Sequence, residues 1–397
     1  MDNNSINRLF YRARYIVLYL LLFLMAISYH PTIVTISHNA GYENGTILSR
    51  YITGVFIILL VLCITFSFWR SSFMRFYLVL SIIAILIGII VYASYGNSLY
   101  VNETRSILLS FFAIIIGWSL NPSKKGIENM MVFFSLCILF SGLMQVIMNI
   151  GGFVIKGQYL ADAKNSLGAL LGTVIISMLI VRKSTDSKMM RLVSALMAVL
   201  GFVIILTVRA RGALLSTILI GSLFFFRLAK KNNNSFVVVF FLLFLALLSL
   251  PFLPDVVTGY IYDSLFAGEQ GEDFSSGRVV AYYQAIDFLS QGNNIWLGDV
   301  DQSYDFAYWI HNYVLLQVFR YGLLFSFPLL VLYFYVFLKS IKGTIHTQSA
   351  LMGGGYPLLM ILLMISLFEP TFPFGPGTAT LFNFILFGTS LRNNAFV

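Results

Sequence analysis

Charged residues are scarce in this chain of 397 residues: only 10% are Asp, Glu, Lys or Arg, whereas 59% are hydrophobic. Soluble domains carry about 25% charged residues, because a water-exposed surface needs them. A chain with so few charges cannot cover a folded core with a polar shell. The composition therefore excludes a soluble globular protein and indicates an integral membrane protein.

Cysteine and histidine are also rare, with two and four residues respectively. Cys63 and Cys137 both lie within long apolar runs, so no disulfide framework or Cys-based metal site is expected. The four histidines are far apart in the sequence, and an Asp-x-Asp pattern at 299–301 has no further ligand cluster to complete a cation site. We therefore expect neither a metal nor a cofactor.

Apolar runs recur along the whole chain, and a helix needs about 20 apolar residues to cross the bilayer core of about 30 Å. Twelve runs approach that length: 15–35, 51–69, 76–95, 106–120, 130–155, 167–181, 192–208, 212–228, 236–253, 312–339, 350–368 and 378–391. The sequence therefore predicts an all-α polytopic membrane protein with about 12 transmembrane helices and one large outer loop.

The basic residues indicate the orientation of these helices through the positive-inside rule. If both termini are cytoplasmic, the inner side carries 17 of the 25 basic residues and only three of the 16 acidic residues. The net charge of +9 is then explained by topology, and no nucleic-acid partner is expected.

The large outer loop divides the chain into residues 1–253 with helices one to nine, the loop 254–311, and residues 312–397 with helices ten to twelve. The loop holds nine acidic residues and eight Tyr or Trp residues. Long ordered loops are uncommon unless they have a function. Carboxylates accept hydrogen bonds from sugar hydroxyls and aromatic faces pack on C–H groups, so the loop suits a glycan. An interfacial aromatic belt with solvated acids is the alternative.

Within this loop, two serines and Gly277 precede apolar residues at helical spacing. The pattern predicts an amphipathic helix from about 277 to 290 that lies on the outer membrane surface. Arg278 then lies in the first turn, where a cation beside free backbone N–H groups suits a phosphate. Alternatively, Arg278 pairs with Glu272 or Asp273.

Two arginines, Arg209 and Arg211, interrupt a pair of apolar runs at a tight outer turn that ends in Gly212. Charges at this depth are costly and tend to be functional, and the planar guanidinium group binds pyrophosphate through two hydrogen bonds. Simple anchoring of the helix ends at the interface is the alternative.

The tenth apolar run begins at His311-Asn312 and is long for a bilayer, about 42 Å as a helix. Arg320 then lies near the outer interface, with Gly322 as a candidate break in the helix. A neutral His311 can accept a proton from a hydroxyl near neutral pH, although a single histidine is more often structural. Glu369, at the end of the eleventh run, is a candidate second base or lipid-headgroup contact.

Three outer positions therefore follow one another in a fixed order, and this order resembles the O-antigen polymerase and O-antigen ligase superfamily of bacterial inner-membrane proteins. The similarity lies in Leu206-Thr207-Val208-Arg209-Ala210-Arg211-Gly212-Ala213-Leu214-Leu215, in Gly277-Arg278, and in His311-Asn312-Tyr313-Val314-Leu315-Leu316 followed by Gly322-Leu323. It covers roughly residues 200–340, whereas the first half of the chain agrees only in hydropathy.

The resemblance implies a metal-independent glycosyltransferase that uses undecaprenyl-diphosphate-linked glycans at the periplasmic face. Arg211 and Arg278 would stabilise the leaving diphosphate, and His311 would be the base for the acceptor hydroxyl. The further substrate-binding candidates are Arg209, Arg320, Asn312, Tyr283 and Glu369. The expected partners are the lipid-linked glycan, the lipid bilayer and, as a candidate, a chain-length regulator protein.

The shared motifs do not separate a polymerase, which extends one lipid-linked chain with repeat units, from a ligase, which transfers the finished chain to lipid A core. We expect a polymerase, because polymerases of this superfamily commonly have an acidic, aromatic periplasmic loop. A lipid or sugar transporter and a structural membrane scaffold are the alternatives. The absence of a visible inverted repeat speaks modestly against a transporter.

Overall fold

The computed structural model describes residues 3–39, 48–64, 66–148, 161–208, 210–231, 278–300, 310–347, 349–368, 373–374 and 378–394. The described residues are helical with short connections, and no strand occurs among them. The prediction of a helical, multi-pass membrane protein is confirmed at this level. The predicted ninth span, 236–253, and most of the predicted loop 254–311 lie outside the described residues.

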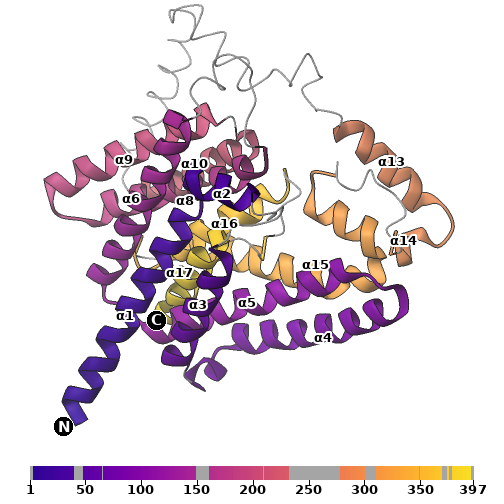
Figure 1. Cartoon of the computed structure of the whole chain (residues 1–397), viewed down its shortest axis with the longest axis horizontal. Helices are drawn as coiled ribbons and strands as arrows, with labels where there is room; N and C mark the ends of the chain where they lie inside the picture. The colour runs from indigo at the N-terminus through magenta and orange to yellow at the C-terminus, as the bar shows by residue number, and fades with distance from the viewer. Residues whose placement is uncertain are drawn as a thin grey trace, which may run out of the picture.

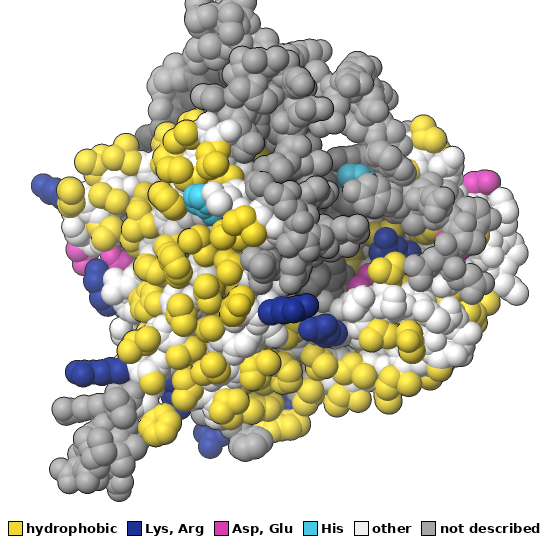
Figure 2. Space-filling model, viewed as in Figure 1, with side chains coloured by type: hydrophobic (Ala, Val, Ile, Leu, Met, Phe, Trp, Pro, Cys, Tyr) yellow, Lys and Arg dark blue, Asp and Glu magenta, His cyan; other side chains and the backbone are white. Residues whose placement is uncertain are grey.

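Seven of the described helices are long and apolar enough to cross a membrane. They are α1 (Asn3–Ile27), α4 (Ser72–Tyr95), α5 (Ser98–Leu120), α6 (Lys124–Met148), α8 (Ala161–Ser184), α9 (Lys188–Thr207) and α15 (Tyr313–His346). Shorter apolar helices are α3 (Ser49–Cys63), α10 (Arg211–Lys231) and α16 (Gly355–Ile365). The last helix is α17 (Thr378–Asn394). Large apolar side chains remain exposed along these helices, as Figure 2 shows, which fits a lipid-facing surface.

Two of the predicted spans are divided in the structure. The first, 15–35, is broken at Pro31, where α2 (Pro31–Asn39) begins after α1 has ended at Ile27. Proline fits the first turn of a helix but lacks the N–H group that a continuous helix needs, so the break is expected at this residue. The second, 51–69, consists of α3 and the 3-10 helix η1 (Phe66–Arg70).

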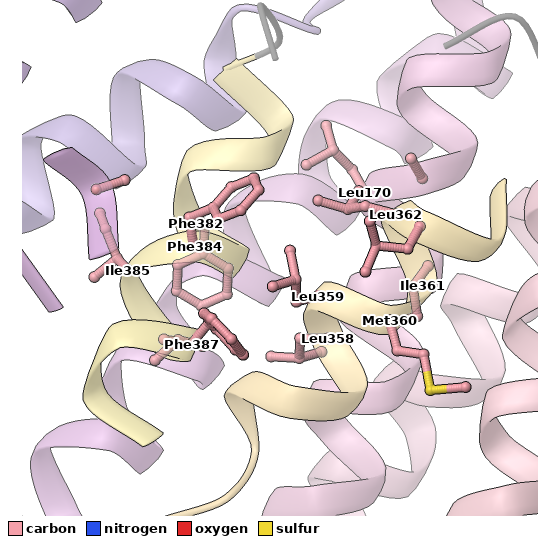
Figure 3. Close-up of a cluster of buried hydrophobic side chains, with 14 of the residues drawn as sticks. Leu170, Leu358, Leu359, Met360, Ile361, Leu362, Phe382, Phe384, Ile385 and Phe387 are labelled. Carbon is pink, nitrogen blue, oxygen red and sulfur yellow. The ribbon is translucent and has the colours of Figure 1, made fainter. Parts of the chain in front are cut away.

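The core is densest where α16 and α17 pack against α5 and α8. Figure 3 shows Leu358 and Leu359 of α16 facing Phe384 and Phe387 of α17, and Leu362 near Leu170 of α8, all of them buried. Glycines allow the helix backbones to approach closely: a Cβ atom at Gly117 would collide with the backbone of α17, and one at Gly388 with that of α5.

The hairpin of α4 and α5 packs against α15, and the three helices lie side by side in Figure 1. Gly96 ends α4 in the left-handed conformation, and Asn97 caps the start of α5 by accepting hydrogen bonds from two backbone N–H groups. The rings of Phe73 and Tyr335 stack at 5.2 Å, whereas Tyr95 contacts Phe325 at 6.4 Å, so α4 and α15 run antiparallel.

Helix α15 is broken at Gly322, whose φ of 62° and ψ of 177° are not helical. The break agrees with the sequence prediction and divides α15 into a short segment, 313–321, and a long one. The small helix α14 (Asn294–Leu297) packs directly on the break, and Asp299 N–H donates a 2.7 Å hydrogen bond to the carbonyl of Phe319. A Cβ atom at Gly322 would collide with the backbone of Trp296, so glycine is required there by both conformation and space.

Candidate functional site

The site is built around the first residues of α15. The Asn312 side chain accepts a 3.0 Å hydrogen bond from the backbone N–H of Leu315 and donates one of 3.2 Å to the carbonyl of Leu367. The backbone N–H of Tyr313 donates to the carbonyl of Ser366 at 2.8 Å. The start of α15 is therefore fixed against the end of α16, and we call this end of the molecule the α15-start end.

Helix α10 begins at the same end of the molecule. This follows from α8, which contacts both α10 and α16. A Cβ atom at Gly172 of α8 would lie 2.5 Å from Thr217 Oγ1 of α10 and 3.4 Å from Ile361 of α16. One turn earlier in α8, the Cβ position of Gly168 lies 2.5 Å from that of Ala210, which precedes α10. The backbone start of α10, at Arg211, thus lies at the level where α16 ends.

Helix α13 (Arg278–Ser290) packs along the short segment of α15. Ala281 and Ala285 are buried against Ile310 and Leu316, and farther along α13 the ring of Phe288 contacts that of Phe319 at 5.1 Å. The two segments therefore run in the same direction. The start of α13, at Arg278, lies toward the start of α15.

The observed α13 agrees with the helix predicted from about 277 to 290, and the face opposite its apolar stripe packs against the protein. The sequence pattern comprised Val279, Val280, Tyr283, Ile286 and Leu289; Val280, Tyr283 and Ile286 are exposed, Tyr283 by 71%, whereas Leu289 is buried. The small residues Ala281 and Ala285 face the protein instead. Small side chains were missed because alanine adds little to an apolar pattern but allows close packing.

Among the sequence candidates, His311 is half-buried and directly precedes the capping residue Asn312. Both polar atoms of the Asn312 side chain are used in holding the helix start. Arg209 and Glu369 lie outside the described residues, as do the side chains of Arg211 and Arg278. The contacts above place the backbone start of α13 toward that of α15, and they connect the start of α10 to α16 through α8.

Arg320 has a partner that the sequence did not indicate, Glu103 of α5. Nη1 of Arg320 lies 3.7 Å from Oε1 of Glu103, and the side-chain amide of Gln317 donates a 3.2 Å hydrogen bond to the same oxygen. The Glu103 side chain is only 12% exposed and that of Arg320 24%. The sequence feature that could have indicated this pair is the position of Glu103 at the border of a predicted span, where an unpaired charge is costly.

Within the described ranges, no group of three His, Cys, Asp or Glu side chains could hold a metal ion. Comparison of the sequence with known proteins gives no relative: no family model matches the chain, and no curated protein matches it.

Proposed function

We propose that this protein is a membrane glycosyltransferase that joins oligosaccharide repeat units carried on undecaprenyl diphosphate, as an O-antigen or surface-polysaccharide polymerase does. The observation that carries the proposal is the common location of three chain segments. The start of α13 lies toward that of α15, and the contacts of α8 with α10 and α16 support the same end for the start of α10; these three starts carry or follow Arg211, Arg278 and His311. Two cations and an imidazole at a bundle end suit an anionic lipid headgroup and a hydroxyl.

The proposed reaction exchanges one C–O bond for another at the anomeric carbon of the donor sugar. The acceptor hydroxyl gives its proton to His311 as its oxygen bonds to that carbon. The bond from that carbon to the lipid diphosphate breaks, and the diphosphate leaves with the electron pair. Arg211 and Arg278 stabilise the negative charge that develops on it, which accelerates the reaction because that charge is larger in the transition state than in the bound substrate.

The proposal includes a location and an orientation. The chain lies in the bacterial inner membrane with both termini in the cytoplasm, so that the α15-start end and the loop 254–311 face the periplasm. The supporting observation is the asymmetry of the basic residues, of which 17 of 25 fall on the side assigned to the cytoplasm. A lipid-linked donor then reaches the site laterally from the outer leaflet.

The test is polymerisation by the purified protein in lipid vesicles, with undecaprenyl-diphosphate-linked repeat units as the substrate and a gel ladder as the readout. We expect Arg211→Ala, Arg278→Ala and His311→Ala each to lower the rate at least about 100-fold, as loss of a transition-state contact does. Arg75→Ala and His346→Ala are the matched controls. Arg75 is near the start of α4 and His346 ends α15, both away from the α15-start end, and both variants should remain active.

Three alanine variants that are folded and still produce long chains would contradict this mechanism. Polymerase and ligase are separated by the surface glycan of a deletion strain. Core bearing a single repeat unit indicates a lost polymerase. Bare core, with long chains accumulating on undecaprenyl diphosphate, indicates a lost ligase.

A further inference from the structure

The cluster of Glu103, Gln317 and Arg320 joins α5 to the short segment of α15. Glu103 lies in the second turn of α5, and Oε1 receives both the Gln317 amide at 3.2 Å and the Arg320 guanidinium at 3.7 Å. The Gln317 side chain is almost completely buried, at 1% exposure. A carboxylate and a guanidinium are thus held at the edge of an apolar bundle, where charges are costly unless they have a function.

This cluster is incompletely paired. Glu103 Oε2 and Gln317 Oε1 are buried and accept no well-formed hydrogen bond from a described residue, although the buried Tyr321 hydroxyl lies next to Glu103 and interacts with its carboxylate. A guanidinium group that serves stability usually closes on a carboxylate with two bonds of about 2.7–2.9 Å, whereas the single contact here is 3.7 Å long. Buried acceptors without well-formed hydrogen bonds destabilise a fold, and a ligand that supplies donors would remove that cost.

The backbone that carries the cluster is fixed on both sides. Asn97 caps α5 and also donates a 2.9 Å hydrogen bond to the carbonyl of Val300. Tyr100 of α5 packs edge-on against Tyr321 at 4.8 Å, and its hydroxyl donates to the carbonyl of Phe325 at 2.8 Å. The two unpaired acceptors are therefore preorganised, and a ligand that uses them loses little free energy in ordering the protein.

We propose that Glu103, Gln317 and Arg320 form a binding subsite for a sugar hydroxyl pair next to a phosphate group. The inference rests on the proposed function, and it assigns to this subsite the first sugar of the lipid-linked glycan. Arg320 binds a phosphate oxygen, while Glu103 Oε2 and Gln317 Oε1 each accept a hydrogen bond from a hydroxyl of the adjacent sugar. A ligand with hydroxyl donors beside an anion matches two acceptors beside a cation.

The long contact between Arg320 and Glu103 provides the entry route. Separating the Arg320–Glu103 ion pair at 3.7 Å costs little free energy, because no short hydrogen bond is broken. Arg320, the more exposed of the two side chains, turns to the phosphate and uncovers the acceptors behind it. Glu103 and Gln317 thereby distinguish a sugar-bearing lipid from the bare lipid diphosphate that leaves after the reaction.

The test compares the binding of two probes to the purified full-length protein in vesicles. One probe is undecaprenyl diphosphate, and the other is undecaprenyl diphosphate bearing a single N-acetylglucosamine. In Glu103→Gln, the amide keeps the side-chain volume but converts one acceptor into a donor. We expect this variant to bind the sugar-bearing probe about tenfold or more weakly, as loss of a hydrogen bond to a charged group does. Its affinity for the bare diphosphate should be unchanged or higher, because Arg320 loses its neutralising partner.

Glu128→Gln is the matched control, since Glu128 is also a buried glutamate paired with a basic residue, Lys125, at 3.2 Å. It is in the first turns of α6, so both probes should bind it as they bind the wild type. A thermal unfolding curve identifies variants that fail to fold, and Gln317→Met supplies a second variant with the same expected probe preference.

Three outcomes contradict the subsite. Equal weakening of both probes in Glu103→Gln would indicate a purely structural residue, and unchanged binding of both would show that no hydroxyl is contacted. Equal affinity of the wild type for the two probes would also overturn it while leaving the proposed function intact. Failure of the wild type to bind either probe would instead overturn the proposed function, and the subsite with it.

Discussion

At the scale of single residues, the structure gives Asn312 a definite role. The residue was a candidate for substrate binding, yet its side chain caps α15 and ties it to the end of α16 through the carbonyl of Leu367. An Asn before an apolar run is a common cap, but only the fold reveals its second hydrogen bond. His311 directly precedes this residue, so the position of the candidate base depends on the cap.

Replacement of Asn312 by alanine should therefore lower both stability and activity. Loss of an N-cap costs about 0.5–2 kcal/mol, so we expect a decrease of a few degrees in the unfolding temperature of the detergent-solubilised protein. Asn312→Asp keeps the acceptor for Leu315 N–H but removes the donor to Leu367, and should retain most of the stability and less of the activity. Unchanged activity in both variants would show that the cap does not position His311.

At the scale of elements, the break in α15 at Gly322 separates two parts of the helix. The short segment, 313–321, begins at the candidate site, and the long segment runs through the bundle. The sequence predicted the break, because the tenth apolar run was too long for a membrane and contained Gly322. The sequence did not predict that α14 would pack on the break at Gly322. It also did not predict that Glu103 of α5 would pair with Arg320. Those contacts join segments far apart in the chain, and periodicity within one segment carries no information about its partner.

Gly322→Ala should be strongly destabilising. The positive φ costs an alanine about 1–3 kcal/mol, and its Cβ atom would also collide with the backbone of Trp296. We expect a clearly lower unfolding temperature and a loss of polymerisation. Gly54→Ala is the control, because Gly54 lies within α3 and a Cβ atom there meets no atom within 4 Å. That change should be neutral or stabilise slightly, by up to about 1 kcal/mol.

A thermal shift of Gly322→Ala no larger than that of Gly54→Ala would mean that α15 can straighten without cost. The break would then be incidental to the fold, and the short segment, 313–321, would not be a separately held element.

At the scale of the whole molecule, the scarcity of charge predicted a membrane protein, and the length of the apolar runs predicted that it is helical. The helix ends were predicted less well: Pro31 divides the first span, and α15 extends to His346, beyond the predicted end at 339. The proposed common location of Arg211, Arg278 and His311 at one bundle end was expected from topology alone. Which helices meet there follows from packing at glycines such as Gly168 and Gly172.

The orientation is tested by labelling single cysteines with a membrane-impermeant thiol reagent on intact spheroplasts. Cys63 and Cys137 are first replaced by alanine. Gln284→Cys, on the exposed side of α13, should be labelled from outside, whereas Asp186→Cys, in the exposed connection between α8 and α9, should react only after the membrane is opened. The reverse pattern would invert the topology, and labelling of both positions in intact spheroplasts would contradict the separation of the two sides.

The glycine crossing of α5 and α17 has a consequence for the order in which the chain is completed. Thr389 Oγ1 donates a 3.1 Å hydrogen bond to the carbonyl of Gly117, across 272 residues of sequence. The face of α5 that packs on α17 therefore has no partner until α17 leaves the ribosome and enters the membrane. Synthesis that stops before Thr378 leaves an unfilled seam through the centre of the bundle, and such a product is a target for membrane proteases rather than a shorter enzyme.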